Sequence, residues 1–253
     1  MPPLVEPDGP LRVAVLFSGG ASGLRYLGHH DDAYGEDYEV VAAFTDKPGA
    51  PGVRVARDLG VPVESNDIDA FYADRDAPIR DLDVRADFDE RTRDLLEPYD
   101  PDVVMLSGYM KILTDAVVER WPVVNVHPAD LRVEDDEGQR RYTGFDPVHD
   151  AIRDGADETR SSVHLVTSDV DDGPLLVVSR AFPVQRELVD ALEAFDADGA
   201  LRSYVEAHQE WMKWRGDGPA LAEALAQLAD GAVALEGDRA TVAGEPAPLV
   251  LGD

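Results

Sequence analysis

The stretch "RWPVVNVHPADL", residues 120–131, joins an apolar run to a polar pair and a proline. The run Val123–Val126 is typical of a buried strand, and Pro128 cannot donate a ladder hydrogen bond, so the strand is expected to end at His127. Side chains alternate along a strand, which points Asn125 and His127 to the same side. Ligands bind at the carboxyl ends of strands in open α/β sheets, so the pair marks a candidate site. A plainer interpretation is that both residues only cap the strand end.

The sequence before this stretch alternates strands and helices. Each apolar run is followed by a loop and by a segment of helical periodicity, as in a mostly parallel, doubly wound sheet. Strands are predicted at Val13–Phe17, Val40–Phe44, Val61–Val63 and Val103–Leu106. Helices are predicted after the glycine-rich turn that follows Phe17, over Val53–Leu59, around 86–97 and over Thr114–Arg120.

The sequence after it changes character. Residues 129–141 are polar and acidic and are predicted as a loop, and strands at 161–168 and 175–184 flank the turn "DVDDGP", which favours antiparallel pairing. Helices are predicted at 147–155, 200–214 and 219–230, and a terminal hairpin around Gly237 and Asp238. We expect one domain over residues 1–253: a parallel βα half with a phosphate loop (1–128), active-site loops and strands (129–185), and helices with a C-terminal hairpin (186–253).

The composition narrows the class of protein. A chain of 253 residues with 44% hydrophobic content can form a sizeable core. It has no apolar run of membrane-spanning length and no signal-peptide pattern at its start, so a soluble cytoplasmic protein is expected. The absence of cysteine excludes thiolate nucleophiles, disulfides and cysteine-bound metals.

The charge is extreme, at −29, with 52 acidic and 23 basic residues. Such a surface argues against binding nucleic acid, which requires basic residues to neutralise phosphates. The acidic residues are spread along the chain, which suggests a halophilic protein in a salt-rich cytosol, where screening limits self-repulsion. Anionic substrates would then need locally positive sites.

The glycine-rich turn "FSGGASGL", residues 17–24, lies between a predicted strand and a predicted helix. Free backbone N–H groups and the helix dipole bind anions at such a turn, which makes Gly20, Ala21, Ser22 and Gly23 candidate phosphate ligands. The glycine spacing is not that of a dinucleotide fingerprint, and no Walker lysine follows. The alternative is a tight connection without a ligand.

The segment "TSDVDDGP", residues 167–174, supplies Asp169, Asp171 and Asp172. Aspartates in turns often only bond their own backbone. A calcium loop would need a further glycine and a distal glutamate, so no metal site is predicted. A carboxylate beside an imidazole orients the ring and raises its pKa, and a nearby asparagine amide can donate to a developing oxyanion. Together the three groups suit acyl transfer without a covalent nucleophile.

In this order, the segments resemble the folate-dependent formyltransferases, and most closely those that formylate glycinamide ribonucleotide (GAR). The resemblance spans nearly the whole chain and implies a Rossmann-like formyltransferase fold with 10-formyltetrahydrofolate as donor cosubstrate, GAR as acceptor in purine biosynthesis, and no metal. It rests on five segments: "VLFSGGASGL", "TDKPGAPGVRVARDLGVP", "RADFDERTRDLLEPYDPDVVMLSGYMKIL", "VNVHP" and "SSVHLVTSDVDDGPLL".

The resemblance also implies roles for particular residues. Asn125, His127 and Asp171 correspond to the catalytic trio, in which the amide and a protonated imidazole assist transfer and the aspartate raises the imidazole pKa. The resemblance implies that the ribonucleotide phosphate contacts the loop of Ala21, Ser22 and Gly23. The resemblance implies that the folate lies along a wall of Met110, Lys111, Ile112 and Leu113, with Arg85 and Asn125 contributing.

Three features depart from the family pattern. The loop after the histidine and proline is longer and acidic here, up to Gly144. Glycine stands at position 23, where the family commonly has asparagine. The late helix normally carries a glutamate that binds the ribonucleotide, for which Gln209 and Glu210 are both candidates.

Other interpretations stay open at this point. His164 matches a family histidine near the site but is equally compatible with a buried structural residue, and the remaining histidines are expected at surface or helix-end positions: His29, His30, His149 and His208. The alternative functions are formylation of another amine, such as a sugar nucleotide or methionyl-tRNA, and noncatalytic binding of folate or phosphate. The tRNA enzymes add a larger basic C-terminal domain and formyltetrahydrofolate hydrolases an N-terminal regulatory one, and neither is expected here. The chain is expected to be a monomer or a homodimer.

Overall fold

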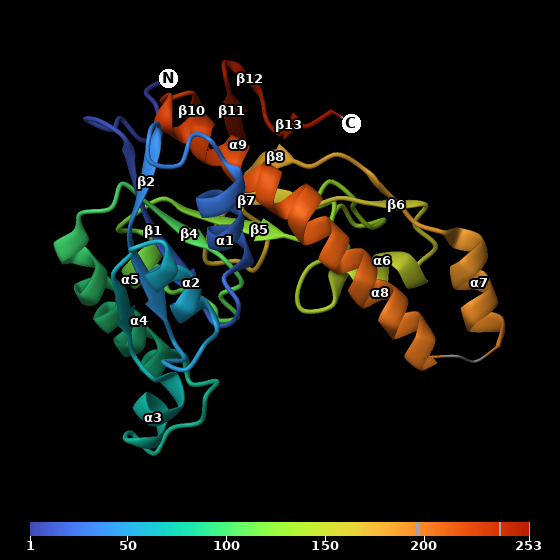
Figure 1. Ribbon diagram of the computed structural model, residues 1–253, viewed down its shortest axis with the longest axis horizontal. Helices are drawn as coiled ribbons and strands as arrows, with labels where there is room; N and C mark the ends of the chain where they lie inside the picture. The colour runs from blue at the N-terminus through green and yellow to red at the C-terminus, as the bar shows by residue number, and fades with distance from the viewer. Residues whose placement is uncertain (196–197, 238, 253) are drawn as a thin grey trace.

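The fold is built on an eight-stranded sheet in the order β13-β8-β7-β5-β4-β1-β2-β3 (Figure 1). The computed structural model describes residues 1–195, 198–237 and 239–252. The strands β1 to β5 pair in parallel, β7 is antiparallel to both of its neighbours, and β13 is parallel to β8. The predicted sheet, mostly parallel with antiparallel later strands, is confirmed. The strands are β1 (Leu11–Phe17), β2 (Tyr38–Thr45), β3 (Val63–Ser65), β4 (Val103–Leu106), β5 (Val123–His127), β7 (Ser162–Leu165), β8 (Leu175–Val178) and β13 (Leu249–Val250).

Helices cover both faces of the sheet. Alternate residues of β1 enter opposite cores: Val13 and Val15 pack with helix residues on one face, and Ala14 and Leu16 on the other. A strand buried on both sides needs a continuous apolar sequence, which is what made β1 recognisable. The first face carries α1 (Ser22–His30), α2 (Gly52–Asp58) and α9 (Gly218–Ala229), and the second carries α3 (Ile68–Ala73), α4 (Leu82–Leu96), the short helix η1 (Glu97–Tyr99) and α5 (Asp115–Val118).

A separate small core joins the remaining helices, and α7 and α8 extend away from the sheet (Figure 1). His208 belongs to this region and is buried, with its Nε2 2.7 Å from the Thr159 hydroxyl. Its predicted surface position is therefore wrong, because the apolar face of its helix is covered. The elements here are α6 (Pro147–Arg153), β6 (Glu158–Thr159), β9 (Phe182–Pro183), α7 (Arg186–Ala194), α8 (Asp198–Met212) and the π-helix η2 (Lys213–Asp217).

The end of the chain returns to the sheet. The strands β10 (Val233–Glu236) and β11 (Arg239–Val242) form the predicted hairpin, whose residue Asp238 lies outside the described residues, and β12 (Glu245–Pro246) extends it. The strand β13 on the edge of β8 was not predicted. The predicted strand 175–184 is divided, because β8 ends at Val178 and β9 pairs with β6 outside the sheet.

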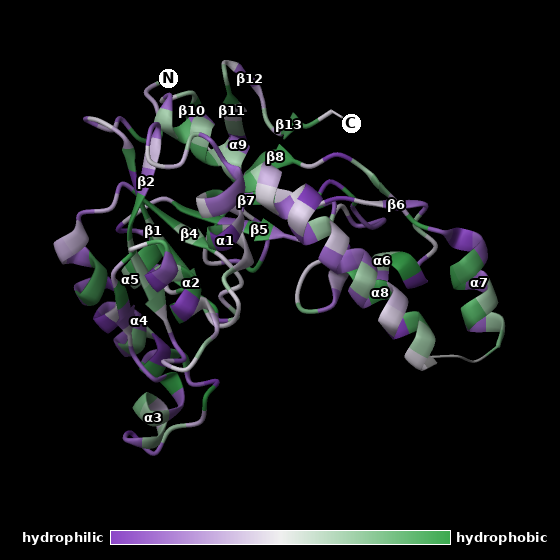
Figure 2. Cartoon of the chain, viewed as in Figure 1, coloured by the Kyte–Doolittle hydropathy of each residue, from purple (hydrophilic) through white to green (hydrophobic). Residues whose placement is uncertain are grey.

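Apolar residues concentrate in the strands of the sheet, and hydrophilic residues lie on the outer sides of the helices (Figure 2). Among the described residues, no helix combines the length and the apolar character needed to cross a membrane.

Candidate active site

A cavity of about 480 Å³ opens at the carboxyl ends of β4 and β5. This is the edge at which ligands bind in open α/β sheets, and the topology explains why polar side chains meet there. Residues from six separate parts of the chain contribute to the wall, among them Ser22, Gly23, Met110, Lys111, Ile112, Leu113, Asn125, His127, Phe145, His164, Val166, Asp171, Gln209, Lys213 and Asp217.

The pairing of β5 with β7 places Asn125 directly opposite His164. Opposed residues of an antiparallel pair point to the same face, so the two side chains meet, with Asn125 Nδ2 3.2 Å from His164 Nε2. The other ring nitrogen of His164, Nδ1, is 2.9 Å from the carbonyl of Leu165. If Nδ1 carries the proton and donates to that carbonyl, Nε2 accepts from the amide. His164 is then a buried ring that orients Asn125.

Asp171 reaches the same place from the loop between β7 and β8. Its Oδ2 lies 3.4 Å from His127 Nδ1, and its Oδ1 lies 3.5 Å from His164 Nε2. The backbone N–H of Gly144 donates to Oδ2 at 3.0 Å. Burial alone would raise the pKa of this carboxyl, but the neighbouring His164 and His127 rings and the Gly144 N–H lower it to about 2. The carboxylate is therefore ionised at neutral pH.

His127 is buried, and both of its ring nitrogens face acceptors. Nε2 is 2.8 Å from the carbonyl of Tyr142, and Nδ1 faces Asp171 at a distance longer than a normal hydrogen bond. Burial lowers the pKa of His127 below its ordinary value, while Asp171 and the Tyr142 carbonyl oppose that change. The sequence predicts that Asp171 raises the pKa of His127, and this prediction is wrong. The pKa falls because desolvation of the ring, which the loop encloses, exceeds the attraction of one carboxylate.

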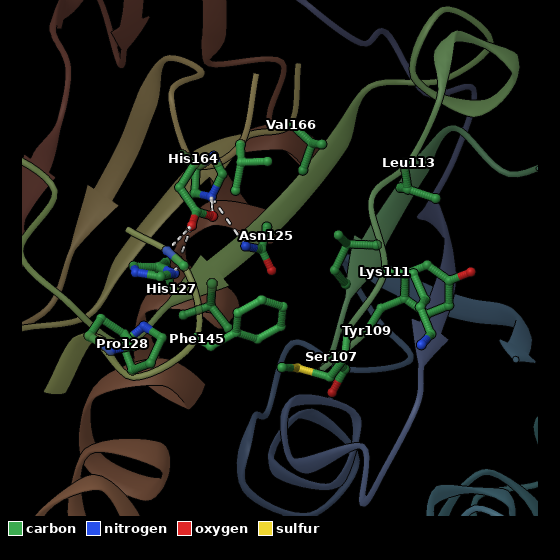
Figure 3. Close-up of a pocket in the computed structure, with 18 of the residues that line it drawn as sticks. Ser107, Tyr109, Lys111, Leu113, Asn125, His127, Pro128, Phe145, His164 and Val166 are labelled. Atoms are coloured by element: carbon green, nitrogen blue, oxygen red, sulfur yellow. Dashed lines mark hydrogen bonds and ion pairs between the residues drawn. The ribbon is translucent and has the colours of Figure 1, made fainter. Parts of the chain in front are cut away.

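Figure 3 shows Asn125, His127 and His164 turned toward one another, with Lys111 and Leu113 on the opposite side of the cavity. Among the described residues, no group of three or more histidine or acidic side chains is arranged to hold a metal ion.

Only some of the residues predicted to bind phosphate in the glycine-rich turn line the cavity. Ser22 and Gly23 line the wall, whereas Gly20 is exposed outside it and Ala21 is buried beneath it. The Gly23 N–H donates to the Ser107 hydroxyl at 2.9 Å, so this donor is used within the protein and does not face the cavity.

Packing explains why position 23 is glycine. A Cβ there would lie 2.8 Å from Leu221 Cδ1 and 3.0 Å from the Ser107 Oγ. The first distance is too short for two carbons and the second is tight, so asparagine would fit only if the Leu221 and Ser107 side chains shifted.

Of the residues predicted to bind folate, all but one line the cavity. Met110, Lys111, Ile112 and Leu113 line the cavity, and the Met110 N–H donates to the Ser18 hydroxyl at 3.0 Å, which ties this loop to the glycine-rich turn.

Arg85 does not reach the wall. It is 4% exposed and lies over the rings of Tyr72 and Phe88 in the core beneath the loop, near Asp89. Arg85 lies on the inner face of α4, so its side chain enters the core and not the cavity wall.

Sequence reasoning missed two charged residues of the wall, Lys213 and Asp217, and did not decide between Gln209 and Glu210. Gln209 lines the cavity, whereas Glu210 is exposed outside it and pairs with Lys213. Burial raises the pKa of Asp217 to about 6, although Ser161 donates a hydrogen bond to it. Because a π-helix interrupts the expected helical spacing, no periodic pattern pointed to this face.

The α/β fold therefore brings a carboxylate, two imidazoles and an amide to one cavity at the carboxyl ends of parallel strands. The sequence profile of the formyl transferase family matches residues 11–194. The chain belongs to that family.

Two curated relatives illustrate the match. The phosphoribosylglycinamide formyltransferase of Escherichia coli (strain K12) is 28% identical over 172 residues, which are 67% of this chain and 72% of that protein. The trifunctional purine biosynthetic protein adenosine-3 of Drosophila melanogaster is 27% identical over 87% of this chain, which corresponds to only 14% of its own length.

Solved structures show the same fold. The phosphoribosylglycinamide formyltransferase of Coxiella burnetii has a TM-score of 0.72 and 23% identity, with 96% of this chain and 100% of that chain covered. A formyltetrahydrofolate deformylase from Pseudomonas putida KT2440 has a TM-score of 0.66 and 19% identity, with 94% of this chain and 71% of that chain covered. The fold alone therefore does not separate transferase from hydrolase.

Proposed function

We propose that this protein is a cytoplasmic enzyme that transfers the formyl group of 10-formyltetrahydrofolate to the primary amine of GAR in purine biosynthesis. The observation that carries the proposal is the convergence of Asn125, His127 and Asp171, distant in the sequence, at one cavity. The named E. coli relative supports the choice of GAR.

Asn125 is the proposed donor to the formyl oxygen. When one N–H of the amide is held by His164, the second N–H is free to donate to an oxygen that gains negative charge. A preoriented donor needs no rearrangement as the charge develops, which is the main advantage of such a site.

His127 is the proposed acid–base group. Its Nε2 is occupied by the Tyr142 carbonyl, so Nδ1, loosely paired with Asp171, is the nitrogen left to exchange protons with the reactants. Asp171 stabilises the imidazolium form and keeps the ring in place. Because burial favours the neutral ring, His127 is ready to accept a proton at neutral pH, and the Asp171 carboxylate stabilises the imidazolium once it has formed.

The wall of the cavity suits two anionic ligands. The chain has only three lysines, and two of them, Lys111 and Lys213, line this cavity. In a protein with a net charge of −29, that placement provides the local positive charge that a phosphate or a folate carboxylate requires. We assign Lys213 and Ser22 to the acceptor, and Met110, Lys111, Ile112 and Leu113 to the folate.

The test measures loss of the formyl group from 10-formyltetrahydrofolate in molar salt, with GAR, a sugar amine or water alone as the acceptor. Turnover that depends on GAR supports the proposal. Turnover without any amine would instead make the protein a hydrolase, and tight folate binding without turnover would make it a binding protein. The His127→Ala variant is the inactive reference, and His149→Ala, at a half-buried position on α6 outside the cavity, is the matched control.

A further inference from the structure

The acidic segment after His127 folds back on itself and brings the half-buried side chain of Arg140 to the site. Glu134 and Arg140 form an antiparallel bridge, and the Arg141 N–H donates to the Val133 carbonyl at 3.0 Å. At the tip, the Asp135 carboxylate accepts from two backbone N–H groups and closes the turn. The segment predicted as an open loop is therefore a small hairpin with an exposed acidic tip.

Arg140 points from this hairpin toward the aspartate turn. Its side chain is 16% exposed. Nη1 donates to the carbonyl of Asp171 at 2.5 Å, and Nη2 donates to the carbonyl of Gly173 at 2.9 Å. Nε lies 4.0 Å from the Asp172 carboxylate. One planar guanidinium thus binds two carbonyls of a single turn, which fixes the orientation of the turn as well as its position.

The turn needs such support because its backbone is strained. Asp171 has a φ of 54°, in the left-handed region, which costs a residue with a Cβ on the order of 1 kcal/mol. The turn also packs closely on the end of β7, since a Cβ on Gly173 would lie 1.9 Å from the Leu165 carbonyl oxygen. A strained conformation persists only when its surroundings hold it.

We propose that Arg140 is a positioning residue, which holds the turn so that the Asp171 carboxylate faces both His127 and His164. The inference rests on the catalytic role proposed for Asp171. The same hairpin segment supplies the Gly144 N–H to Asp171 and the Tyr142 carbonyl to His127, so Arg140 also anchors the backbone that contacts both groups.

Replacement of Arg140 should also change the titration of His127. The groups that act on this ring are Asp171 and the Tyr142 carbonyl, which raise its pKa, and His164 and Arg140, which lower it together with burial. Loss of the guanidinium charge moves the pKa of His127 upward, whereas displacement of Asp171 and of the Tyr142 carbonyl moves it downward, so a net fall is the signature of lost positioning.

The test compares Arg140→Met, which keeps the aliphatic stem, with Arg132→Met as the matched control. Arg132 lies on the same segment but pairs with Asp130, away from the turn. We expect kcat of Arg140→Met to fall on the order of 10- to 100-fold with little change in KM, because the reacting groups are misplaced and not removed. Added methylguanidinium should restore part of kcat, and methylammonium should not, because only the planar cation can bind both carbonyls.

Two measurements do not depend on turnover. Amide exchange at Gly144 and the NMR titration of His127 should change in Arg140→Met and stay as in the wild type in Arg132→Met. Unchanged exchange and titration would overturn the inference, as would a wild-type kcat in Arg140→Met. If Arg140→Met does not fold, Arg140→Lys is measured in the same way, and wild-type exchange and titration in that variant would equally refute the role of the planar group. If the wild type shows no formyl transfer, the proposed function fails, while these two measurements still decide whether Arg140 holds the turn.

Discussion

The Asp171 carboxylate serves two histidines at once, one oxygen facing each ring. At the scale of the residue, this shared carboxylate links the ring proposed to exchange protons to the ring that contacts the Asn125 amide. Its low pKa keeps it ionised at neutral pH.

We expect Asp171→Asn to lower kcat by a factor on the order of 10² to 10⁴, the usual contribution of an acid–base partner. The amide keeps the size of the carboxyl but cannot stabilise an imidazolium. The measurement is formyl transfer in the steady state, with Asp136→Asn on the exposed hairpin tip as the control. A kcat of Asp171→Asn within a few-fold of the wild type would contradict the assignment.

The same carboxylate should contribute to stability in a pH-dependent manner. Because its pKa falls from 3.8 in the unfolded chain to about 2 in the fold, the contribution is full above about pH 4 and is lost as the pH falls through about 2. The shift corresponds to about 2 kcal/mol. Urea unfolding of the wild type and of Asp171→Asn from neutral to acid pH measures it: the two free energies of unfolding should converge at low pH. Parallel curves would show that the carboxyl has no special environment.

At the scale of the element, the turn between β1 and α1 is fixed by packing on Ser107 and Leu221. Its glycines are not equivalent, although they look alike in the sequence. A Cβ on Gly20 would meet nothing within 4 Å, whereas one on Gly23 would meet both neighbours.

Gly23→Ala should therefore destabilise the fold by roughly 1 to 3 kcal/mol, the usual cost of overpacking. Gly20→Ala should change the free energy of unfolding by less than about 0.5 kcal/mol, as expected at an open surface position. Thermal unfolding of the two variants checks this difference. Equal stability of both would mean that the Leu221 side chain moves aside freely.

The elements that the sequence predicted best are those whose residue pattern follows from a single physical requirement. β5 and its polar end were predictable because apolar residues fill the strand and Pro128 ends it. The contact between Asn125 and His164 depends on the register of β5 on β7, which no local pattern determines. The hairpin that carries Arg140 was read as an open loop because its pairing consists of one bridge around polar residues.

The sequence left the choice between Gln209 and Glu210 open, and the wall residues beyond them were missed for a different reason. Helical periodicity assumes a constant number of residues per turn, and the π-helix Lys213–Asp217 breaks that assumption at the wall of the cavity. Helical periodicity therefore did not predict Lys213 and Asp217, because their side chains reach the cavity from the π-helix itself.

At the scale of the whole molecule, the acidic surface should make stability depend on salt. With a net charge of −29, repulsion destabilises the compact state at low ionic strength, and added salt screens it. We expect Tm to rise by several degrees or more between dilute buffer and molar potassium chloride. An equal rise with a neutral osmolyte at matched osmolarity, or no rise at all, would remove charge repulsion as the cause.

The two-residue strand β13 has a consequence for solutions of this protein. It is a short cover over the hydrogen-bonding edge of β8, and such a cover opens more easily than the interior of a sheet. While it is open, another copy can add a strand there, and only mutual repulsion between negatively charged molecules discourages the encounter. Concentrated salt therefore acts in two directions: it protects each molecule from unfolding and also lets neighbouring molecules come close enough to aggregate through this edge.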